Sequence, residues 1–162
     1  MNTFYLPILL LALFSCSFPP QPKERELNAQ HEEPLGYDPD LATRLKADEY
    51  GMGQYVMAFL KRGPNRDLDS LEAVELQRAH MENIGKLAQA GKLLLAGPFM
   101  DDGDLRGIYI FDVKTVEEAQ ALTETDPAIQ AGSLVMELHP WYGSAAVREI
   151  NSLHTRISKA NP

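Results

Sequence analysis

The sequence predicts a domain of the α+β class, with elements in the order strand, helix, strand, strand, helix, strand. Four short apolar runs rich in strand-forming residues are bounded by turn residues. Two segments between these runs have helical periodicity and begin at residues that cap helices. With 162 residues, of which 44% are hydrophobic, the chain can form one core with extensions at both ends.

We divide the chain into a signal peptide (1–16), a tether with a short helix (17–52), the folded domain (53–143) and a C-terminal helix (144–162). Residues 4–14 are apolar apart from Pro7. Roughly eleven such residues are too few to span a bilayer, but they match the core of a signal peptide. We therefore expect an exported protein.

Residues 13–16, Leu-Phe-Ser-Cys, resemble the lipobox of bacterial lipoproteins, in which the cysteine carries the lipid. Cys16 is the only cysteine, so an exported form cannot build an internal disulfide. The alternative is an ordinary thiol within the signal core. We predict lipidation of Cys16 and membrane attachment through this anchor only. The protein then belongs to the cell envelope, facing the periplasm or as an outer-membrane lipoprotein.

The tether is rich in proline and charged residues and has no periodicity, which is typical of an extended segment. Near its end, Asp38-Pro39-Asp40 offers a helix N-cap with proline at the first helical position. Gly51 closes a short amphipathic segment through Leu41 and Leu45. We expect a small docking helix there.

The folded domain begins with a strand and a long helix. The continuous apolar run from Tyr55 to Leu60 predicts the first strand. Asp69 or Ser70 then caps a helix that ends near Gly91.

The second and third strands are predicted over 92–99 and 105–113. The polar loop Asp101-Asp102-Gly103-Asp104 between them is typical of a hairpin turn. We therefore expect these two strands to be antiparallel neighbours.

The last elements follow a second helix signal. Thr115-Val116-Glu117-Glu118 is a capping box that starts this helix. Asp126-Pro127 begins a further short helical turn. Residues 134–139 predict the fourth strand, stopped by Pro140, and residues 144–157 predict a last amphipathic helix.

This order of elements is the split βαβ arrangement of ferredoxin-like domains, with both helices on one face of a four-stranded sheet. The other face has no predicted cover, although the first and third strands carry apolar groups on both sides. Such a surface packs most simply against a second copy, so we expect a homodimer. The C-terminal helix then covers the domain edge or reaches the partner.

Composition excludes several classes of partner and cofactor. The formal charge of −8 and the lack of clustered Lys and Arg argue against nucleic acids and anionic lipid surfaces. The sequence has no His or carboxylate spacing of the kind that binds zinc, and no phosphate-binding glycine pattern or nucleophile-elbow serine. We therefore expect no metal and no nucleotide cofactor.

His80 is the principal candidate for chemistry. In a helix, the apolar residues of its segment fall on one arc: Ala73, Val74, Leu76, Met81, Ile84, Leu87 and Ala88. His80 and Gln77 lie within this arc. A ring directed at the interior needs hydrogen-bond partners, and a nearby carboxylate makes it a candidate acid or base. The alternative is a structural histidine satisfied by Gln77 or a backbone carbonyl.

Four segments together resemble the YCII-related (YciI-like) domain family: Arg78-Ala79-His80, the glycine-flanked run 91–99, Asp126-Pro127 and Pro140-Trp141. The resemblance covers about residues 53–143. It implies a ferredoxin-like fold that dimerises into an α/β barrel, and a His and an Asp as the active pair. The matching residues are His80 and Asp126. From the sequence alone, Asp126 is equally an ordinary N-cap, and one carboxylate can fill both roles.

The resemblance implies proton-transfer chemistry on small cyclic organic acids or phenols. We therefore expect a cofactor-free enzyme of the lyase or isomerase type, with Asp126 orienting His80 and one ring nitrogen open to a cavity for substrate. The alternatives are a non-catalytic dimer that binds a small molecule at the cell envelope, and an envelope protein that contacts other proteins. A ring nitrogen sealed in the core favours the structural role of His80.

Further residues are candidates for binding the substrate. Gly97-Pro98-Phe99 ends a strand, where glycine permits a close backbone approach and amides can face a ligand; a plain strand-to-turn transition is the alternative. Tyr50, Arg106 and Trp141 are candidates for lining a pocket, and surface or interface packing is the alternative for each.

Overall fold

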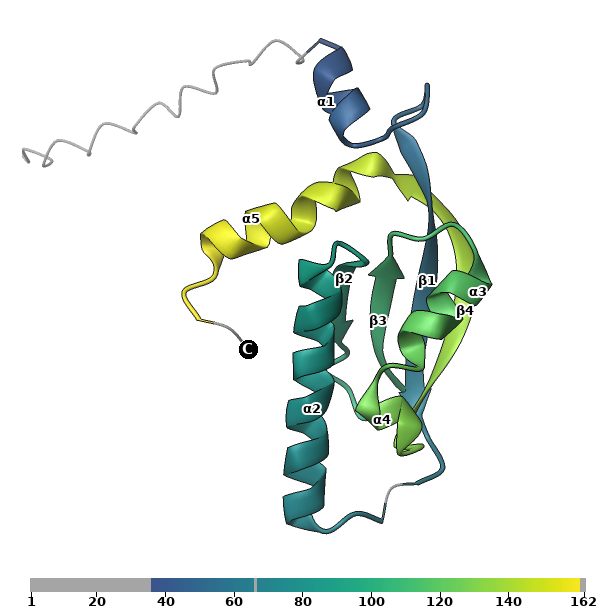
Figure 1. Cartoon of the computed structure of the whole chain (residues 1–162), viewed down its shortest axis with the longest axis vertical. Helices are drawn as coiled ribbons and strands as arrows, with labels where there is room; N and C mark the ends of the chain where they lie inside the picture. The colour runs from purple at the N-terminus through teal and green to yellow at the C-terminus, as the bar shows by residue number, and fades with distance from the viewer. Residues whose placement is uncertain (1–35, 66, 161–162) are drawn as a thin grey trace, which may run out of the picture. The chain divides into compact units, whose positions relative to one another are not determined.

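The computed structural model describes residues 36–65 and 67–160, and a four-stranded antiparallel sheet in the order β2-β3-β1-β4 is its central element (Figure 1). The strands are β1 (Met52–Arg62), β2 (Leu93–Pro98), β3 (Leu105–Phe111) and β4 (Leu134–Ser144). This order is that of the split βαβ arrangement. The predicted α+β class is confirmed, whereas the signal peptide and Cys16 lie outside the described residues.

Three helices lie on one face of the sheet: α2 (Ser70–Gln89), α3 (Val116–Thr123) and α4 (Pro127–Gln130) (Figure 1). The predicted caps start α2 and α3, and the structure shows a capping box at each. Asp69 pairs with Glu72 at α2, and Thr115 pairs with Glu118 at α3. Gly91, whose φ of +67° is in the left-handed region, follows the end of α2.

The main core fills the space between this helix layer and the sheet. Side chains alternate along a strand, so every second residue of β1 points at the helices. The buried members of this core are Val56, Ala58, Leu60, Leu87, Leu93, Tyr109, Phe111, Val113 and Ala119. It therefore joins three strands to α2 and α3 and fixes the helix layer on the sheet.

The opposite face of the sheet is only partly covered. At one end, Val147 packs against buried Tyr55, Leu94 and Ile110. Farther along the sheet Phe59 is half-buried, and other apolar side chains on this face are also only partly covered. The prediction that β1 and β3 carry apolar groups on both faces is confirmed, and the second copy expected on this face stays a prediction.

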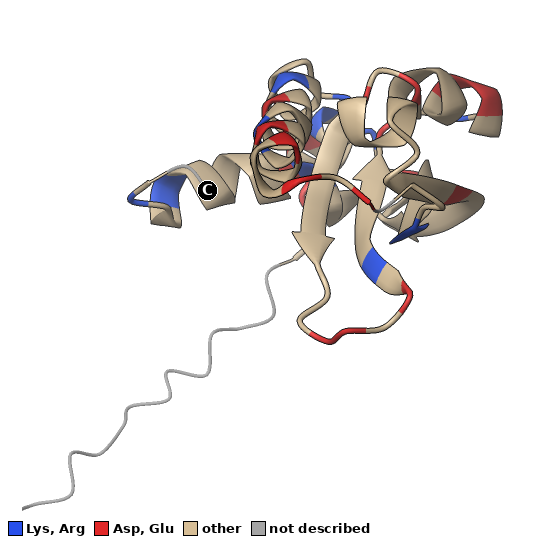
Figure 2. Cartoon of the chain, turned by 90° about the horizontal axis from the view of Figure 1, so that it is seen from below, with Lys and Arg blue, Asp and Glu red and all other residues tan. Residues whose placement is uncertain are grey.

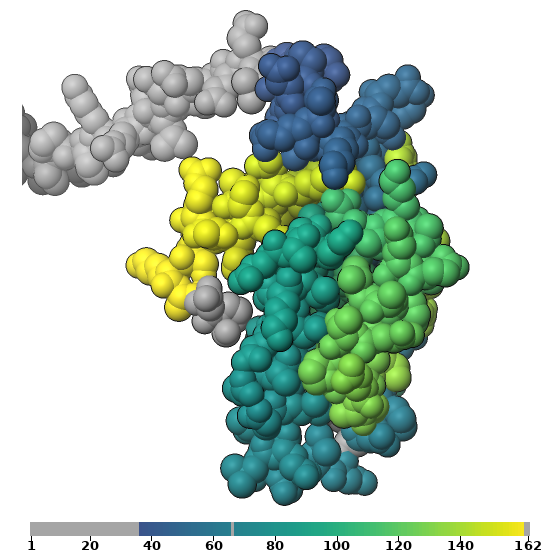
Figure 3. Space-filling model, in the orientation of Figure 1, coloured from purple at the N-terminus to yellow at the C-terminus, as the bar shows by residue number. Residues whose placement is uncertain are grey.

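The chain before β1 and after β4 packs against one end of the sheet. The helix α1 (Pro39–Arg44) begins at the predicted N-cap Asp38. Arg148 fixes both extensions, because its guanidinium binds the Asp112 carboxylate at 2.7 Å and the Leu45 carbonyl at 2.7 Å. The helix α5 (Ile150–Ile157) packs against the start of β2, where the amide of Asn151 donates to the Leu93 carbonyl at 2.8 Å. In Figure 3 the C-terminal segment, in yellow, lies against one end of the teal part of the molecule.

Two predicted boundaries are wrong. Pro140 does not stop the fourth strand, which continues to Ser144. β4 is an edge strand, and an edge tolerates proline because every second N–H points away from the neighbouring strand. The C-terminal helix does not begin at Ser144 either, since a 3₁₀ helix, η1 (Ala145–Glu149), precedes α5. None of the helices in the described residues combines the length and hydropathy that a bilayer span requires.

Candidate active site

His80 lies on the buried stripe of α2, which points at the sheet and at α4. The buried residues of this helix are His80, Asn83 and Leu87, which follow one another at three- and four-residue intervals along one face. Gln77 is exposed and therefore does not satisfy the ring. The alternative in which Gln77 is the partner of His80 is excluded by this orientation.

Asp126 occupies the N-cap of α4 and is among the most deeply buried polar residues of the described chain, with 1% of its surface exposed. Its Oδ1 accepts the backbone N–H of Ala128 at 2.9 Å. Its Oδ2 lies 2.8 Å from Nδ1 of His80. The two residues that the family resemblance implies as a pair are thus in contact although they lie 46 positions apart, and one carboxylate both caps α4 and meets the ring.

Tyr109 is a third member of this cluster that the sequence did not single out. Its Oη lies 3.4 Å from Nε2 of His80, and the two rings stack with centroids 6.4 Å apart. Burial, and then the charge of Asp126, raise the pKa of the Tyr109 phenol above its ordinary value, so the hydroxyl keeps its proton. Tyr109 can therefore donate toward Nε2.

The Asp126 contact places a hydrogen on Nδ1, because a carboxylate only accepts hydrogen bonds. In the neutral ring Nε2 then has the lone pair, to which the Tyr109 hydroxyl can donate. At 3.4 Å the contact with Tyr109 is longer than a well-formed hydrogen bond, for which about 2.8 Å is usual. Nε2 is thus a weakly engaged proton acceptor held in place from the Nδ1 side.

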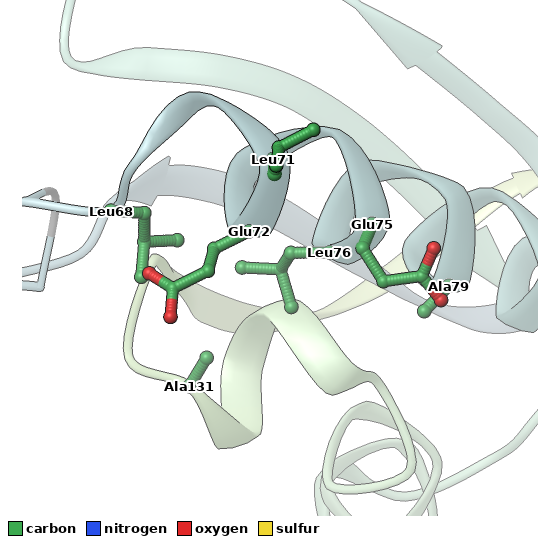
Figure 4. A pocket seen from close by; sticks show the side chains of 7 residues that line it. All are labelled: Leu68, Leu71, Glu72, Glu75, Leu76, Ala79 and Ala131. Carbon is green, nitrogen blue, oxygen red and sulfur yellow. The ribbon is translucent and has the colours of Figure 1, made fainter.

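The predicted opening of a ring nitrogen to a cavity is not found in this arrangement, because Nε2 faces the Tyr109 hydroxyl. The described chain has a groove of about 530 Å³ between the first half of α2 and the end of α4 (Figure 4). Leu68, Leu71, Glu72, Glu75, Leu76, Ala79 and Ala131 line it. Ala79 is the chain neighbour of His80, but neither His80 nor Asp126 belongs to the lining.

The weaker substrate-binding candidates lie elsewhere. Gly97 pairs with Ile108, and a Cβ on Gly97 would meet nothing within 4 Å. On the neighbouring strand β3, a Cβ on Gly107 would lie 2.6 Å from the Gly97 carbonyl oxygen, so this position requires a glycine. Pro98 ends β2, and Phe99 is 40% exposed beyond it.

The remaining candidates also make contacts outside the His80 cluster. Tyr50 is 77% exposed in the turn before β1. Arg106 donates to the Asp101 carbonyl at 3.1 Å, so it binds its own hairpin loop. Trp141 packs against Tyr55 on the partly covered face of the sheet, with ring centroids 5.6 Å apart. Their roles in binding a substrate stay predictions.

A second histidine–carboxylate pair lies on β4. His139 Nε2 is 2.8 Å from Glu137 Oε1, and Lys61 of β1 also pairs with this carboxylate. Both side chains are about half exposed, at 49% and 46%. The Lys61 ammonium, and then His139, hold the pKa of the Glu137 carboxyl below its usual range.

Acidic residues are numerous on the surface, notably along α2 and in the loop between β2 and β3 (Figure 2). Among residues 36–65 and 67–160 they form no group of three or more His, Cys, Asp or Glu side chains placed to hold a metal ion.

A ferredoxin-like α+β domain with a buried His-Asp pair on its helix layer is the class that these observations define. Within that class, the chain belongs to the YCII-related domain family, whose sequence profile matches residues 54–142. Among solved structures, it is similar to 5-chloro-2-hydroxyhydroquinone dehydrochlorinase from Burkholderia phenoliruptrix AC1100 in complex with 2,5-dihydroxybenzoquinone. That match has 21% identity and a TM-score of 0.41, and it covers 55% of this chain and 93% of that one. No curated protein matches the chain.

Proposed function

We propose that this protein is a cofactor-free enzyme of the lyase or isomerase type, which transfers a proton on a small cyclic or aromatic acid. His80 is the general base and then the general acid, and Asp126 orients it. The observation that carries the proposal is the 2.8 Å contact between Nδ1 of His80 and the buried carboxylate of Asp126.

The contact supports this role through geometry and charge. A carboxylate on Nδ1 fixes the tautomer and stabilises the imidazolium that forms when Nε2 takes a proton. The Ala128 N–H also binds Asp126, so the carboxylate is held in one orientation by α4. Nε2 is left with one long contact to a hydroxyl, which has to rotate away before Nε2 meets a substrate.

The second candidate is a binding protein without turnover, which holds a small molecule at the cell envelope. The enclosure of the His80 side chain, of which 9% is exposed, favours it. In that case the His80–Asp126 contact joins α2 to α4 and stabilises the fold around a ligand site.

The setting of either function is also a proposal. We propose that the chain is exported and anchored through Cys16, and that two copies pair through the partly covered sheet face. Half-buried Phe59 and Ile108 on that face support the pairing, because apolar groups there gain from being covered.

The test is a thermal-shift screen of the full chain with aromatic acids and lactones, followed by a turnover assay with each ligand that binds. His80→Ala is compared with wild type, and His139→Ala is the matched control from the exposed pair. A ligand at a hundred times its Kd stabilises the folded state by about 2.7 kcal/mol. For an enzyme, we expect turnover in wild type and in His139→Ala, and none in His80→Ala.

Each other outcome has a defined meaning. Ligand binding without turnover in wild type favours the binding protein. Turnover that survives in His80→Ala contradicts the proposed mechanism. If no compound shifts the melting temperature of wild type, neither small-molecule function stands.

A further inference from the structure

The side-chain oxygen of Asn83 is buried and has no hydrogen-bond partner in the protein, and within the described residues it is the one buried side-chain polar atom of which this is true. Asn83 exposes 9% of its surface and lies on the buried stripe of α2. Buried carbonyl oxygens nearly always accept a hydrogen bond, so an orphan acceptor calls for a specific explanation.

The orientation of this amide is fixed by its other end. The Nδ2 group donates to the Thr125 carbonyl at 3.1 Å and to the Thr125 hydroxyl at 2.9 Å. The hydroxyl itself donates to the Leu122 carbonyl at 2.7 Å, so it has a lone pair for Asn83. A flipped amide would set its oxygen against the Thr125 carbonyl, and two acceptors do not bind each other.

The orphan oxygen belongs to the neighbourhood of the His80–Asp126 pair. Asn83 follows His80 by three residues, so the two side chains are adjacent on one face of α2. Their partners, Thr125 and Asp126, are consecutive in the chain. One turn of α2 thus contacts the dipeptide Thr125-Asp126 through the side chains of His80 and Asn83. The Asn83 oxygen is the atom of this group that has no partner in the protein.

We infer that Asn83 is a substrate-binding residue, whose oxygen accepts a hydrogen bond from an O–H or N–H of the molecule on which His80 acts. The inference rests on the proposed function and narrows its substrate class: the small acid carries a hydroxyl or amino donor close to the carbon that loses or gains the proton. An unpaired buried acceptor is destabilising in the free protein, and a ligand donor removes that cost. A ligand that lacks the donor leaves the oxygen unpaired and binds more weakly.

The test uses ligands that differ by one hydroxyl. Binding of benzoate and of its 2-, 3- and 4-hydroxy derivatives is measured by calorimetry on the full chain. The variant is Asn83→Leu, which removes the acceptor at similar volume. Asn151→Leu is the matched control, because Asn151 also donates to a backbone carbonyl, at 2.8 Å, but lies on α5.

We expect wild type to bind at least one hydroxylated ligand about tenfold more tightly than benzoate. Asn83→Leu loses this preference, whereas Asn151→Leu keeps it. If Asn83→Leu does not fold, Asn83→Ala takes its place in the same measurement.

Two results overturn the inference: a hydroxyl preference that survives in Asn83→Leu, or no hydroxyl preference in wild type. The proposed function fails separately. If Asn83→Leu abolishes the preference while His80→Ala changes neither binding nor turnover, the donor site stands and the role of His80 does not.

Discussion

The two histidine–carboxylate pairs of this protein have the same nitrogen-to-oxygen distance, 2.8 Å, in opposite surroundings. In the His80–Asp126 pair the side chains expose 9% and 1% of their surface. In the His139–Glu137 pair they expose 49% and 46%. Contact distance therefore does not distinguish a candidate active pair from a surface pair.

The difference lies in what surrounds each carboxylate. Glu137 is shared with the Lys61 ammonium and faces water, which screens its attraction for His139. Asp126 has no lysine or arginine partner among its described contacts and binds one backbone N–H and one ring. Because water does not screen this buried carboxylate, its attraction for a positive charge on the ring is stronger, and this makes His80 the stronger candidate.

The largest expected effect comes from removing the two carboxylates in turn. Asp126→Ala leaves a buried ring without its partner and removes the N-cap of α4. Losing the cap costs about 1 kcal/mol and the unpaired ring about 2 kcal/mol, so we expect the free energy of unfolding to fall by roughly 3 kcal/mol. Glu137→Ala should leave it unchanged within error. Urea unfolding of both variants measures the difference.

Asp126→Asn separates the two losses, because its single amide oxygen still caps α4 while its NH2 group takes the place of the oxygen that faces Nδ1. It should recover the roughly 1 kcal/mol of the cap and little of the remainder. Equal effects of Asp126→Ala and Glu137→Ala would contradict the contrast drawn between the pairs.

The sequence predicted those elements whose signals are local. The cap predicted at Asp69 or Ser70 and the capping box predicted at Thr115 are signals within four residues, and both helices begin there. The continuation of β4 past Pro140 was missed, because a proline is tolerated there only if the strand lies at the edge of the sheet. That position is set by the long-range pairing of β4 with β1, which no local signal reports. The boundary of the last helix was missed too, since η1 packs against β1 and β2.

The helix containing His80 shows a similar limit. Periodicity placed Val74 on the apolar arc, yet Val74 is 69% exposed because the first half of α2 extends beyond the main core. His80 was noticed as a polar residue among apolar ones. Tyr109 was not, because a tyrosine in a strand has the same pattern as any aromatic core residue; its alternation with Phe111 was the available signal. Asn83 was not noticed either, although it is a polar residue three positions after His80 on the same face of the helix.

The second prediction concerns whether the two pairs still differ in exposure when the protein is assembled. A homodimer through the partly covered sheet face would enclose His139 and Glu137 and make the pairs alike. Phe59 packs edge-on against His139 at 5.6 Å between centroids, so Phe59→Asp places a charge in that interface. We expect the dimer Kd to rise by at least about thirtyfold, corresponding to roughly 2 kcal/mol.

Sedimentation equilibrium over a range of concentrations measures this Kd. Val74→Asp, on the exposed side of α2, is the matched control and should leave it unchanged. A wild-type protein that stays monomeric, or a dimer indifferent to Phe59→Asp, would remove the sheet face as the interface and leave the contrast between the pairs intact.

The smallest expected effect concerns the phenol that faces Nε2. Tyr109→Phe removes a long contact of 3.4 Å, so the free energy of unfolding at pH 7 should fall by about 1 kcal/mol or less. The tautomer should persist, because Asp126 still accepts from Nδ1; ¹⁵N NMR of the ring nitrogens reports it. Tyr142→Phe is the exposed control, since Tyr142 donates to Asp48 at 2.5 Å on the surface.

The same variant has a pH signature whose sign follows from burial. Because the folded-state pKa of Tyr109 is raised, its contribution to stability is fully present below about pH 10, where tyrosines in the unfolded chain begin to ionise, and is lost as the pH rises further. Wild type should therefore lose stability above pH 10 more steeply than Tyr109→Phe, whereas Tyr142→Phe should follow wild type more closely. Parallel curves for Tyr109→Phe and wild type would show that the phenol is not enclosed beside His80, and the buried pair would then lose the environment that separates it from the exposed one.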